Sequence, residues 1–529
     1  MRTEIREKAV EEASEQKDGK IVNGGDAHQA KKLGEVLQGT QAVVPVRHAG
    51  MEIRQIACDS RKVRPCSLFF ALRGAKADGN AFVRDAVSRG AVAVVSEDAA
   101  PSGLPSSIPW IRVEEGRKGL AIAAANFFDR PPEALQLVAV TGTNGKTTTT
   151  SLIDSILKAS GAKTGLFGTV AYHTPRGEYP APNTTPESVD LQGLLAEIRD
   201  EGGRYAVLEA SSHALSMDRL WGCHFAAAVF TNLTREHMDY HKTFEDYFAA
   251  KRRLFEGTGA GVPEAGVLNA DDEYGRRLAG LAKSSVTYGI EKAADISVRK
   301  FQLNFSGLAF TAHTPGGKLH IESPLVGRIN VYNILAAIGA GQALGFSSEA
   351  IEQGIRDLKS VSGRFQSVDS GQRFLVVVDY AHTDDALENL IKTARELNPE
   401  GRVITLFGCG GGKDRTKRPV MGDVSGRLSD LTILTNDNPR QEDPVKIIGD
   451  IVVGLQKTAG KYMIEPDREK AIGLAIDEAR AGDIVLLAGK GHETYQVLAD
   501  KTVDWDDREM ARKALSERGY PGVEERKEL

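Results

Sequence analysis

The chain has 529 residues, which is too long for a single hydrophobic core and predicts about three domains. An apolar content of 41%, a charged content of 26% and a net charge of -5 are typical of an ordinary globular protein and give no sign of general nucleic-acid binding. No apolar run approaches the ~18 residues of a membrane span, no secretory signal is seen, and the four cysteines show no metal-binding spacing, so we expect reduced thiols and a cytoplasmic protein.

A polar N-terminal extension is expected over residues 1–30, followed by a small α/β domain over residues 31–134. In this domain the apolar runs Ser67–Gly74 and Ala91–Ser96 are typical of strands, with a helix-like segment between them. A loop before the first run carries Ser60, which could bind a polar ligand, although such residues more often lie on the surface without one. Two consecutive prolines near the end of the domain indicate a linker.

The central domain, expected over residues 135–362, begins with a stretch typical of a phosphate-binding loop. A buried strand (Leu137–Val140) leads into the letters TGTNGKTTT and then into a helix whose apolar residues share one face. Backbone N–H groups of such a loop and of the helix N-terminus bind phosphate oxygens, Lys146 adds a positive charge, and the Thr147 hydroxyl can reach Mg²⁺. The general NTPase pattern has a glycine where this chain has Val140, so the loop is a shortened variant.

Polar side chains follow two later strands of the central domain. The run Tyr205–Leu208 leads into Glu209, and the run Ala226–Phe230 leads toward His237. Because ligands gather at the carboxyl ends of parallel strands, both side chains are expected beside the phosphates, where a carboxylate is a common Mg²⁺ ligand and an imidazole a less common one. A lone histidine after a strand is, however, more often structural. By spacing alone, Lys251 is an ordinary basic residue on a helix.

Residues 295–323 alternate between apolar and polar side chains, which predicts an accessory β-sheet. A third α/β pattern follows later in the chain. The pattern over residues 363–529 predicts a second doubly wound sheet. The polar strand ends of this last domain include Asp379, Lys413, Arg440 and Glu493. Arginine can clamp a carboxylate and glutamate can accept an ammonium group, which suits an amino acid. The residues alone therefore predict an ATP-dependent acid–amine ligase that activates the acid as an acyl phosphate.

Several motifs occur in one order along the chain: TGTNGKTTT, EASSHAL, FTNLTREHMDYH, AAK, GRINVYN, SGRF, DYAH, DNPR and GKGHE. In this order they resemble the Mur ligase family, from about Leu33 to residue 515. The resemblance implies an α/β fold with a small UDP-binding domain, a P-loop ATPase domain with a parallel sheet, and a Rossmann-like C-terminal domain. It also implies a cytoplasmic step of peptidoglycan synthesis, in which ATP phosphorylates the D-Glu carboxylate of UDP-MurNAc-L-Ala-D-Glu and a diamino acid attacks it. We expect a monomer.

The resemblance further implies roles for individual residues. It places ATP against Gly142, Thr143, Asn144, Gly145, Lys146, Thr147, Thr148, Asn333, Arg364 and Asp379. It places Mg²⁺ against Thr147, Glu209, His237 and a carbamylated Lys251, with catalytic roles for Lys146, His237 and Lys251. It places the UDP-linked substrate against Ser60, Asn183, Thr184, Thr185, Ser211 and Arg219. Carbamylation turns an ammonium group into an anion, so the resemblance reverses the interpretation of Lys251 as an ordinary helix residue.

The DNPR motif implies meso-diaminopimelate as the incoming amino acid, because the L-lysine enzymes of the family lack its arginine. Diaminopimelate has a second carboxylate that L-lysine lacks, and Arg440 can clamp it. The implied amino-acid site consists of Lys413, Asp437, Asn438, Pro439, Arg440, Gly489 and Glu493. Lys413 stands where many diaminopimelate enzymes have an arginine, so the charge is kept but the planar fork is lost.

Three alternatives remain open at this point. The first is the same ligase using L-lysine. The second is a folylpolyglutamate synthase-like ligase, which would need neither the N-terminal domain nor DNPR. The third is an ATP-binding regulatory or scaffold protein without turnover, against which the presence of Lys146, Glu209, His237, Lys251 and Asp379 argues.

Overall fold

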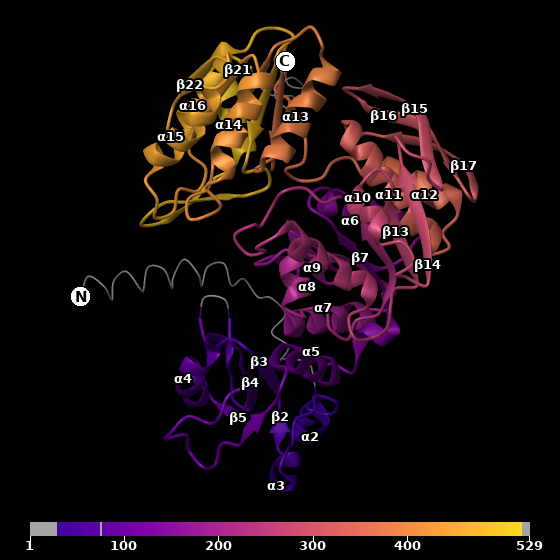
Figure 1. Cartoon of the computed structure of the whole chain (residues 1–529), viewed down its shortest axis with the longest axis vertical. Helices are drawn as coiled ribbons and strands as arrows, with labels where there is room; N and C mark the ends of the chain where they lie inside the picture. Colours follow the sequence, from indigo (N-terminus) through magenta and orange to yellow (C-terminus); the bar gives the residue numbers. More distant parts are fainter. Residues whose placement is uncertain (1–28, 75–76, 521–529) are drawn as a thin grey trace.

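The computed structural model describes residues 29–74 and 77–520, which form three α/β domains arranged in chain order along the molecule (Figure 1). The N-terminal domain lies at the bottom of this view and the C-terminal domain at the top. The polar extension expected over residues 1–30 lies almost entirely outside the described residues. None of the described helices is long and apolar enough to cross a membrane.

The N-terminal domain is built on a parallel sheet of order β3-β4-β5-β6. Its strands are β3 (Gln55–Ala57), β4 (Ser67–Ala71), β5 (Ala91–Ser96) and β6 (Trp110–Arg112), beside a separate antiparallel pair of β1 (Lys31–Lys32) and β2 (Glu52–Ile53). Its helices are α2 (Leu33–Val36), α3 (Val46–Ala49), α4 (Val83–Ser88) and α5 (Gly116–Phe127), with short 3₁₀ turns η1 (Ser60–Lys62) and η2 (Gly79–Phe82). The two strands expected from the sequence are β4 and β5.

The consecutive prolines expected to mark a linker begin a 3₁₀ turn, η3 (Pro131–Ala134), and both prolines are buried. Proline is tolerated in a first helical turn because its missing N–H would have no partner there. The turn packs on α7 (Ser188–Asp200) of the central domain, so the N-terminal and central domains are joined by a packed segment.

The central domain is built on an eleven-stranded sheet of order β10-β9-β8-β11-β7-β12-β13-β14-β15-β16-β17. Its strands are β7 (Gln136–Thr141), β8 (Thr164–Phe167), β9 (Ala171–Thr174), β10 (Gly177–Pro180), β11 (Tyr205–Glu209), β12 (Phe225–Phe230), β13 (Ala265–Asn269), β14 (Ser284–Gly289), β15 (Ile296–Asn304), β16 (Gly307–Thr314) and β17 (Gly317–Ser323). The expectation of an accessory sheet over residues 295–323 is wrong in one respect. The strands β15–β17 extend the central sheet, because β14 pairs in parallel with β15 through Tyr288 and Ile296.

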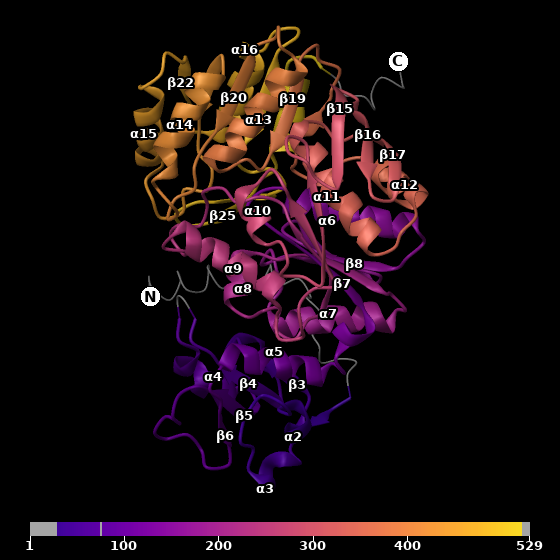
Figure 2. The same ribbon diagram turned by 45° about the vertical axis from the view of Figure 1, so that its right-hand side comes forward.

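Helices cover both faces of the central sheet (Figure 2). One face packs against α6 (Lys146–Ala159), α11 (Arg328–Ala343) and α12 (Ser348–Asp357), and the other against α7, α8 (Ser212–Ser216), α9 (Phe244–Glu256) and α10 (Glu273–Arg277). Successive side chains of a strand point to opposite faces, so Val138 and Val140 of β7 enter the first core while Leu137 and Ala139 enter the second. The strand is therefore buried on both sides, as its continuous apolar run predicts.

The C-terminal domain is a six-stranded sheet of order β18-β19-β23-β20-β21-β22, in which only β18 is antiparallel. Its strands are β18 (Gln366–Val368), β19 (Leu375–Asp379), β20 (Val403–Phe407), β21 (Leu431–Leu434), β22 (Tyr462–Ile464) and β23 (Ile484–Ala488), and a hairpin of β24 (Tyr495–Val497) and β25 (Thr502–Asp504) lies outside the sheet. One face packs against α13 (Asp384–Leu397), α14 (Lys417–Leu428) and α15 (Pro444–Leu455), and the other against α16 (Arg468–Glu478) and α17 (Asp507–Ser516). This confirms the expected doubly wound sheet.

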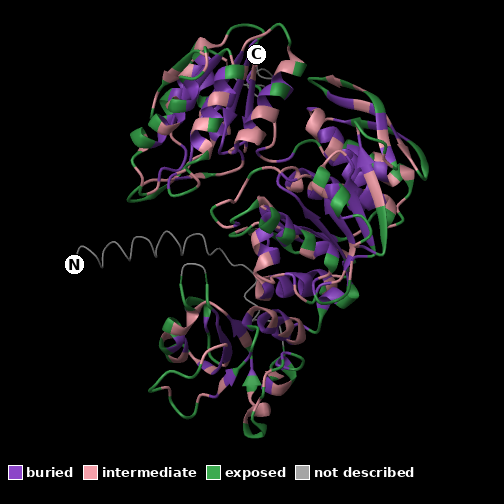
Figure 3. Ribbon diagram, in the orientation of Figure 1, coloured by how far each residue is buried: buried purple, intermediate pink, exposed green. Residues whose placement is uncertain are grey.

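Buried residues are concentrated in the strands of the large sheets and in the inner faces of their helices (Figure 3). The carboxyl ends of β7, β11 and β12 lead into polar loops, and so does the carboxyl end of β19 in the C-terminal domain. These loops line one cavity between the two domains. The fold thus brings strand ends from two separate sheets to a common site, as ligand sites of open parallel sheets require.

Candidate active site

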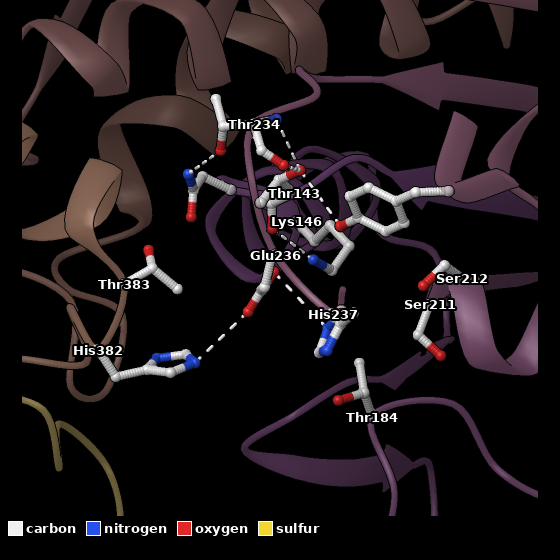
Figure 4. A network of polar contacts seen from close by, with 12 residues as sticks. Thr143, Lys146, Thr184, Ser211, Ser212, Thr234, Glu236, His237, His382 and Thr383 are labelled. Carbon is white, nitrogen blue, oxygen red and sulfur yellow. Dashed lines mark hydrogen bonds and ion pairs between the residues drawn. The ribbon is translucent and has the colours of Figure 1, made fainter. Parts of the chain in front are cut away.

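A cavity of about 250 Å³ lies between the central and C-terminal domains. The central domain contributes the loop after β7, Glu209 after β11, and the segment containing His237 after β12. The C-terminal domain contributes the loop after β19 and one side of α13. Figure 4 shows polar side chains of both domains meeting there.

The loop of residues 142–145 begins and ends at glycines with positive φ, a backbone conformation that other residues rarely adopt. Gly142 has φ 147° and Gly145 has φ 86°, and a Cβ on Gly145 would lie 2.4 Å from Asn333 Oδ1. Helix α6 begins directly after this loop, and none of the described side chains caps it. Its first N–H groups therefore remain available for an anion, and the helix dipole favours negative charge at the same point. The geometry is that of a phosphate-binding loop.

Two lysine side chains converge on this loop. Lys146 Nζ donates to the carbonyls of Gly142 (3.0 Å) and Thr143 (2.7 Å), and Lys251 Nζ donates to the same Gly142 carbonyl at 2.7 Å. Lys251 is only 1% exposed, and burial together with the charge of Lys146 holds its pKa well below the usual lysine value. The interpretation of Lys251 as an ordinary helix residue is therefore wrong, because tertiary packing buries it against the loop.

Glu209, His237 and Thr147 line the same cavity as Lys251. Glu209 is buried and accepts hydrogen bonds from the backbone N–H of Thr169 (2.8 Å) and from its hydroxyl (3.1 Å), which fixes the carboxylate. His237 has φ 57°, an unusual conformation for a non-glycine residue that aims its ring toward the cavity. Burial and the nearby lysine charges lower the pKa of His237, so the ring is held as the neutral imidazole that can bind a metal.

The structure tests whether this donor set suits Mg²⁺. Within the described part of the chain, no group of three or more His, Cys, Asp or Glu side chains is arranged as a metal site. The ligands expected for Mg²⁺ include only two side chains of these types, Glu209 and His237. The other two expected ligands are the hydroxyl of Thr147 and a carbamate on Lys251. A hydroxyl, a carboxylate and a carbamate supply the oxygen ligands that Mg²⁺ prefers. Thr147 and Glu209 thus offer oxygen atoms that suit the ion, and Lys251 would add a third oxygen ligand only as a carbamate.

The sequence interpretation missed Glu236, which lies beside the phosphate-binding loop. Its carboxylate pairs with His382 of the C-terminal domain at 3.4 Å and with His237 at 3.6 Å. Burial by itself would raise the pKa of Glu236, but the hydrogen bond from His382 and the proximity of His237, His382 and Lys146 lower it well below the usual value. The sequence does contain a signal for this residue, because Glu236 directly precedes His237 in the polar segment that follows β12.

Asp385 on the first turn of α13 was also missed. It accepts hydrogen bonds from Asn144 Nδ2 (2.6 Å) and Thr234 Oγ1 (3.3 Å), and burial raises its pKa. Arg364 likewise crosses between the domains, donating to Thr147 Oγ1 at 3.1 Å. Because these partners are far apart in the sequence, spacing gave no sign of their contacts.

The remaining residues expected to contact ATP surround the same cavity. Asn333 on α11 accepts from Thr149 Oγ1 at 3.3 Å, beside the loop glycine described above. Asp379 ends β19 and accepts from the backbone N–H groups of Phe365 (2.7 Å) and Ala381 (2.8 Å). Burial raises the pKa of Asp379. The residues expected at the ATP site therefore line this cavity, except Gly142, whose carbonyl accepts from the lining residues Lys146 and Lys251.

Most residues expected to bind the UDP-linked substrate form a second cluster next to Glu209. Thr185 Oγ1 donates to the Glu209 carbonyl at 2.7 Å, and Arg219 Nη1 donates to the Thr185 carbonyl at 2.9 Å. Ser211 also donates to and accepts from Thr185, Thr184 accepts from Thr169, and the carbonyl of Asn183 accepts from Tyr172. Ser60 lies apart from this cluster in η1 of the N-terminal domain, where its side chain is buried and hydrogen-bonds to Asp85.

The residues expected to bind the amino acid lie in the C-terminal domain. Arg440 has φ 55°, and its Nη1 donates to the carbonyls of Gly411 (3.0 Å) and Asn438 (3.3 Å). Asn438 Nδ2 donates to Glu493 Oε2 at 2.9 Å. A Cβ on Gly489 would lie 2.8 Å from Asp437 Oδ2, so a glycine allows this close approach.

Two further members of this set flank the arginine. Pro439 lies so near the glycine loop that a Cβ on Gly411 would meet its carbonyl oxygen at 1.9 Å. Lys413 is exposed on the same loop after β20. The loop of residues 437–440 and the loop after β20, which contains Gly411 and Lys413, thus lie against each other and form one charged site.

Comparison with known proteins gives consistent results. Three domain models match the chain: "Mur ligase family, catalytic domain" at residues 52–128, "Mur ligase middle domain" at residues 140–341, and "Mur ligase, glutamate ligase domain" at residues 363–491. A UDP-N-acetylmuramoyl-L-alanyl-D-glutamate--2,6-diaminopimelate ligase of Solibacter usitatus (strain Ellin6076) is 53% identical over 491 residues, 92% of this chain and 99% of the relative.

A relative of the same description from Geobacillus kaustophilus (strain HTA426) is 46% identical over 90% of this chain and 97% of its own length. A solved structure of a protein with this description superposes with a TM-score of 0.65 and 31% identity, covering 93% of this chain and 99% of that chain. The matched segments include parts of all three domains and the relatives align over nearly their whole length. This chain belongs to the Mur ligase family.

Proposed function

We propose that this protein is an ATP-dependent ligase that joins meso-2,6-diaminopimelate to the D-Glu carboxylate of UDP-MurNAc-L-Ala-D-Glu. The observation that carries the proposal is the charged site of the C-terminal domain, where Arg440 and Glu493 lie on either side of Asn438. An arginine for a carboxylate and a glutamate for an ammonium group match the distal end of diaminopimelate. The 53% identical relative is described as a ligase for the same amino acid.

The reaction requires activation of an acid. A carboxylate oxygen is a poor leaving group at neutral pH, so an amine does not displace it directly. Transfer of the ATP γ-phosphoryl group to the D-Glu carboxylate gives an acyl phosphate and ADP. The neutral amino group of diaminopimelate then attacks the acyl carbon and releases a proton to solvent as the amide bond forms. The phosphate leaves with the electron pair of the broken C–O bond.

Different residues around the cavity would bind the ATP phosphates, Mg²⁺ and the rest of the nucleotide. The loop Gly142–Thr148 and α6 would bind the ATP phosphates, with Lys146 neutralising charge that develops during transfer. Thr147, Glu209, His237 and carbamylated Lys251 would hold Mg²⁺, which supplies positive charge to the phosphate oxygens when bound. The depressed pKa of Lys251 supports the modification, since only a neutral amine can add CO₂. Asn333, Arg364 and Asp379 would contact the rest of the nucleotide.

The other substrates would lie on either side of the ATP. The cluster of Asn183, Thr184, Thr185, Ser211 and Arg219, together with Ser60, would bind the UDP-linked dipeptide. Lys413, Asp437, Asn438, Pro439, Arg440, Gly489 and Glu493 would bind diaminopimelate. We further propose that the protein acts as a monomer in the cytoplasm, where the nucleotide-linked precursor and ATP are both available.

The alternatives are less well supported. The same ligase using L-lysine would leave Arg440 without the ligand carboxylate that its position favours. A folylpolyglutamate synthase-like enzyme would not need the N-terminal domain, yet residues 52–128 match the Mur ligase family. A scaffold without turnover would not need Lys251 buried against the phosphate-binding loop.

The test is phosphate release by the purified protein with ATP, Mg²⁺, UDP-MurNAc-L-Ala-D-Glu and a panel of amino acids. We expect release that depends on both the UDP-linked dipeptide and meso-diaminopimelate, with little turnover of L-lysine at the same concentration. Comparable turnover of L-lysine would overturn the amino-acid assignment. Phosphate release with a folate and L-glutamate, but not with the UDP-linked dipeptide, would favour the second alternative.

A further inference from the structure

A lysine that the proposed reaction does not use, Lys490, is fully buried beside the amino-acid site. Its side chain is 0% exposed, while that of its ion-pair partner Glu493 is 15% exposed. Lys490 Nζ donates to Glu493 Oε2 at 3.0 Å and to Asn438 Oδ1 at 3.1 Å. Burying an ammonium group costs free energy unless it is paired, so the pairing with Glu493 is what makes this position tolerable.

The three side chains form a closed hydrogen-bonded triangle. Asn438 Nδ2 donates to Glu493 Oε2 at 2.9 Å, and Asn438 Oδ1 also accepts from the backbone N–H of Val497 at 2.9 Å. Glu493 thus accepts both of these side-chain hydrogen bonds through Oε2. No described residue donates to its Oε1. One carboxylate oxygen is held in place while the other is left for a ligand.

The triangle also determines the charge of the site. Lys490 and Glu493 neutralise each other, so the carboxylate is not an uncompensated buried anion. Nearby, Arg440 donates to backbone carbonyls, and no described carboxylate forms an ion pair with it. Among the described residues, Arg440 thus has no carboxylate partner, whereas Glu493 is already paired with Lys490, and Asp437 adds a second carboxylate beside Gly489.

We propose that Lys490 is a positioning and specificity-determining residue that makes this site select a zwitterionic amino-acid end over a lone ammonium group. The inference rests on the proposed function, in which the distal end of diaminopimelate enters this site. Such an end brings a carboxylate for Arg440 as well as an ammonium for Glu493. The distal end of L-lysine brings only an ammonium, which would meet a Glu493 already paired with Lys490 and would supply no carboxylate to Arg440.

The experiment compares the wild-type enzyme with Lys490→Met, which keeps the length of the side chain and removes its charge. The kcat/KM for meso-diaminopimelate and for L-lysine are measured on the same preparation, together with the KM for ATP. The ratio of the two kcat/KM values does not depend on the fraction of folded enzyme. Lys470→Met is the matched control, because Lys470 belongs to the same domain and its side chain is 72% exposed on α16.

We expect Lys490→Met to lower the ratio of the kcat/KM for diaminopimelate to that for L-lysine by about tenfold, mainly through a lower KM for L-lysine, whose ammonium no longer competes with Lys490 for Glu493. The KM for ATP and all values for Lys470→Met should stay close to wild type. Adding Glu493→Gln to Lys490→Met makes the pair neutral again and should raise the ratio above that of Lys490→Met alone.

Equal losses for the two amino acids would show that Lys490 only supports the fold, and an unchanged ratio would show that its charge does not affect selection. Either result overturns the inference while leaving the proposed function intact. A wild-type enzyme that used neither amino acid would overturn the proposed function, and the inference with it.

Discussion

At the scale of single residues, Lys251 shows how packing changes the chemistry of a side chain. Its helix position is ordinary, but the fold places its Nζ 2.7 Å from the Gly142 carbonyl, beside Lys146 and over the ring of Tyr247. Burial and the second lysine make the ammonium form unfavourable. A neutral amine in this position is suited to carbamylation, which would convert it into an anion next to the ATP phosphates.

We therefore expect Lys251→Ala to lower kcat by about 10²-fold or more, because the anion that helps to hold Mg²⁺ is lost. Short carboxylic acids such as formate or propionate should restore part of the activity by occupying the vacated space. The measurement is phosphate release with and without the added acid. Arg252→Ala on the same helix is the control, since Arg252 is 45% exposed and pairs with Glu256. Full activity of Lys251→Ala would contradict the carbamate role.

The glycines of the phosphate-binding loop allow a second prediction for single residues. Gly145 and Gly161 have similar positive φ values, 86° and 83°, but only Gly145 has a neighbour within 4 Å of an added Cβ, at 2.4 Å from Asn333 Oδ1. The backbone cost of alanine, about 1–2 kcal/mol, is thus common to both positions, whereas the clash arises only in Gly145→Ala. We expect calorimetric ATP binding to be lost in Gly145→Ala and retained in Gly161→Ala. Equal ATP affinities in the two variants would show that the loop tolerates the extra carbon.

At the scale of elements, α8 and the segment before α9 contain histidines held in the neutral form. Burial lowers the pKa of His213 to about 4 and that of His241 to about 4. An unfolded histidine binds a proton near pH 6.5. Between these values the unfolded chain binds more protons than the folded one, so these groups stabilise the fold above pH 6.5 and lose that contribution as the pH falls toward 4.

The stability of the central domain should accordingly fall between pH 6.5 and pH 4.5. We expect the Tm from scanning calorimetry to decrease over this range, and to decrease less in His213→Asn, which cannot take up the proton. The pH dependence is the readout, since the substitution also changes Tm at neutral pH through packing. Identical pH profiles for the variant and the wild type would contradict the assignment of His213.

At the scale of the whole molecule, contacts between the phosphate-binding loop and α13 connect two domains. Asp385 accepts from Asn144 and Thr234, and His382 pairs with Glu236, so the C-terminal domain is held against the ATP site by a few polar contacts. Interfaces of this kind permit domain movement. The arrangement places the third domain where ATP binding can affect its position.

Removing one of these contacts should loosen the arrangement. We expect Asp385→Ala without nucleotide to have a larger radius of gyration in small-angle X-ray scattering than the wild type, because Asn144 loses its partner across the interface. Asp384→Ala, one residue earlier in the same helical turn, is the matched control. An unchanged radius of gyration in Asp385→Ala would show that this contact does not hold the domains together.

Local sequence patterns determined a large part of this protein. The phosphate-binding loop, the strands that lead to it and the doubly wound C-terminal sheet follow from glycine placement and from apolar runs, which act over short stretches of chain. The same is true of Glu209 and Asp379, because a polar residue at the end of a buried strand lies at the edge where ligands bind. The ordered motifs in addition predicted that the chain belongs to the Mur ligase family, which the comparisons confirm.

Only the tertiary structure decided the rest. Lys251 and Gly142 are 109 residues apart, and spacing on a helix cannot show which distant carbonyl a side chain reaches. The joining of β15 to the central sheet, the pairing of Glu236 with His382, and the triangle around Lys490 depend in the same way on contacts that chain folding creates. The sequence by itself therefore determined where phosphate binds and which elements form. Burial and long-range pairing decided the charge states of the side chains that surround the site.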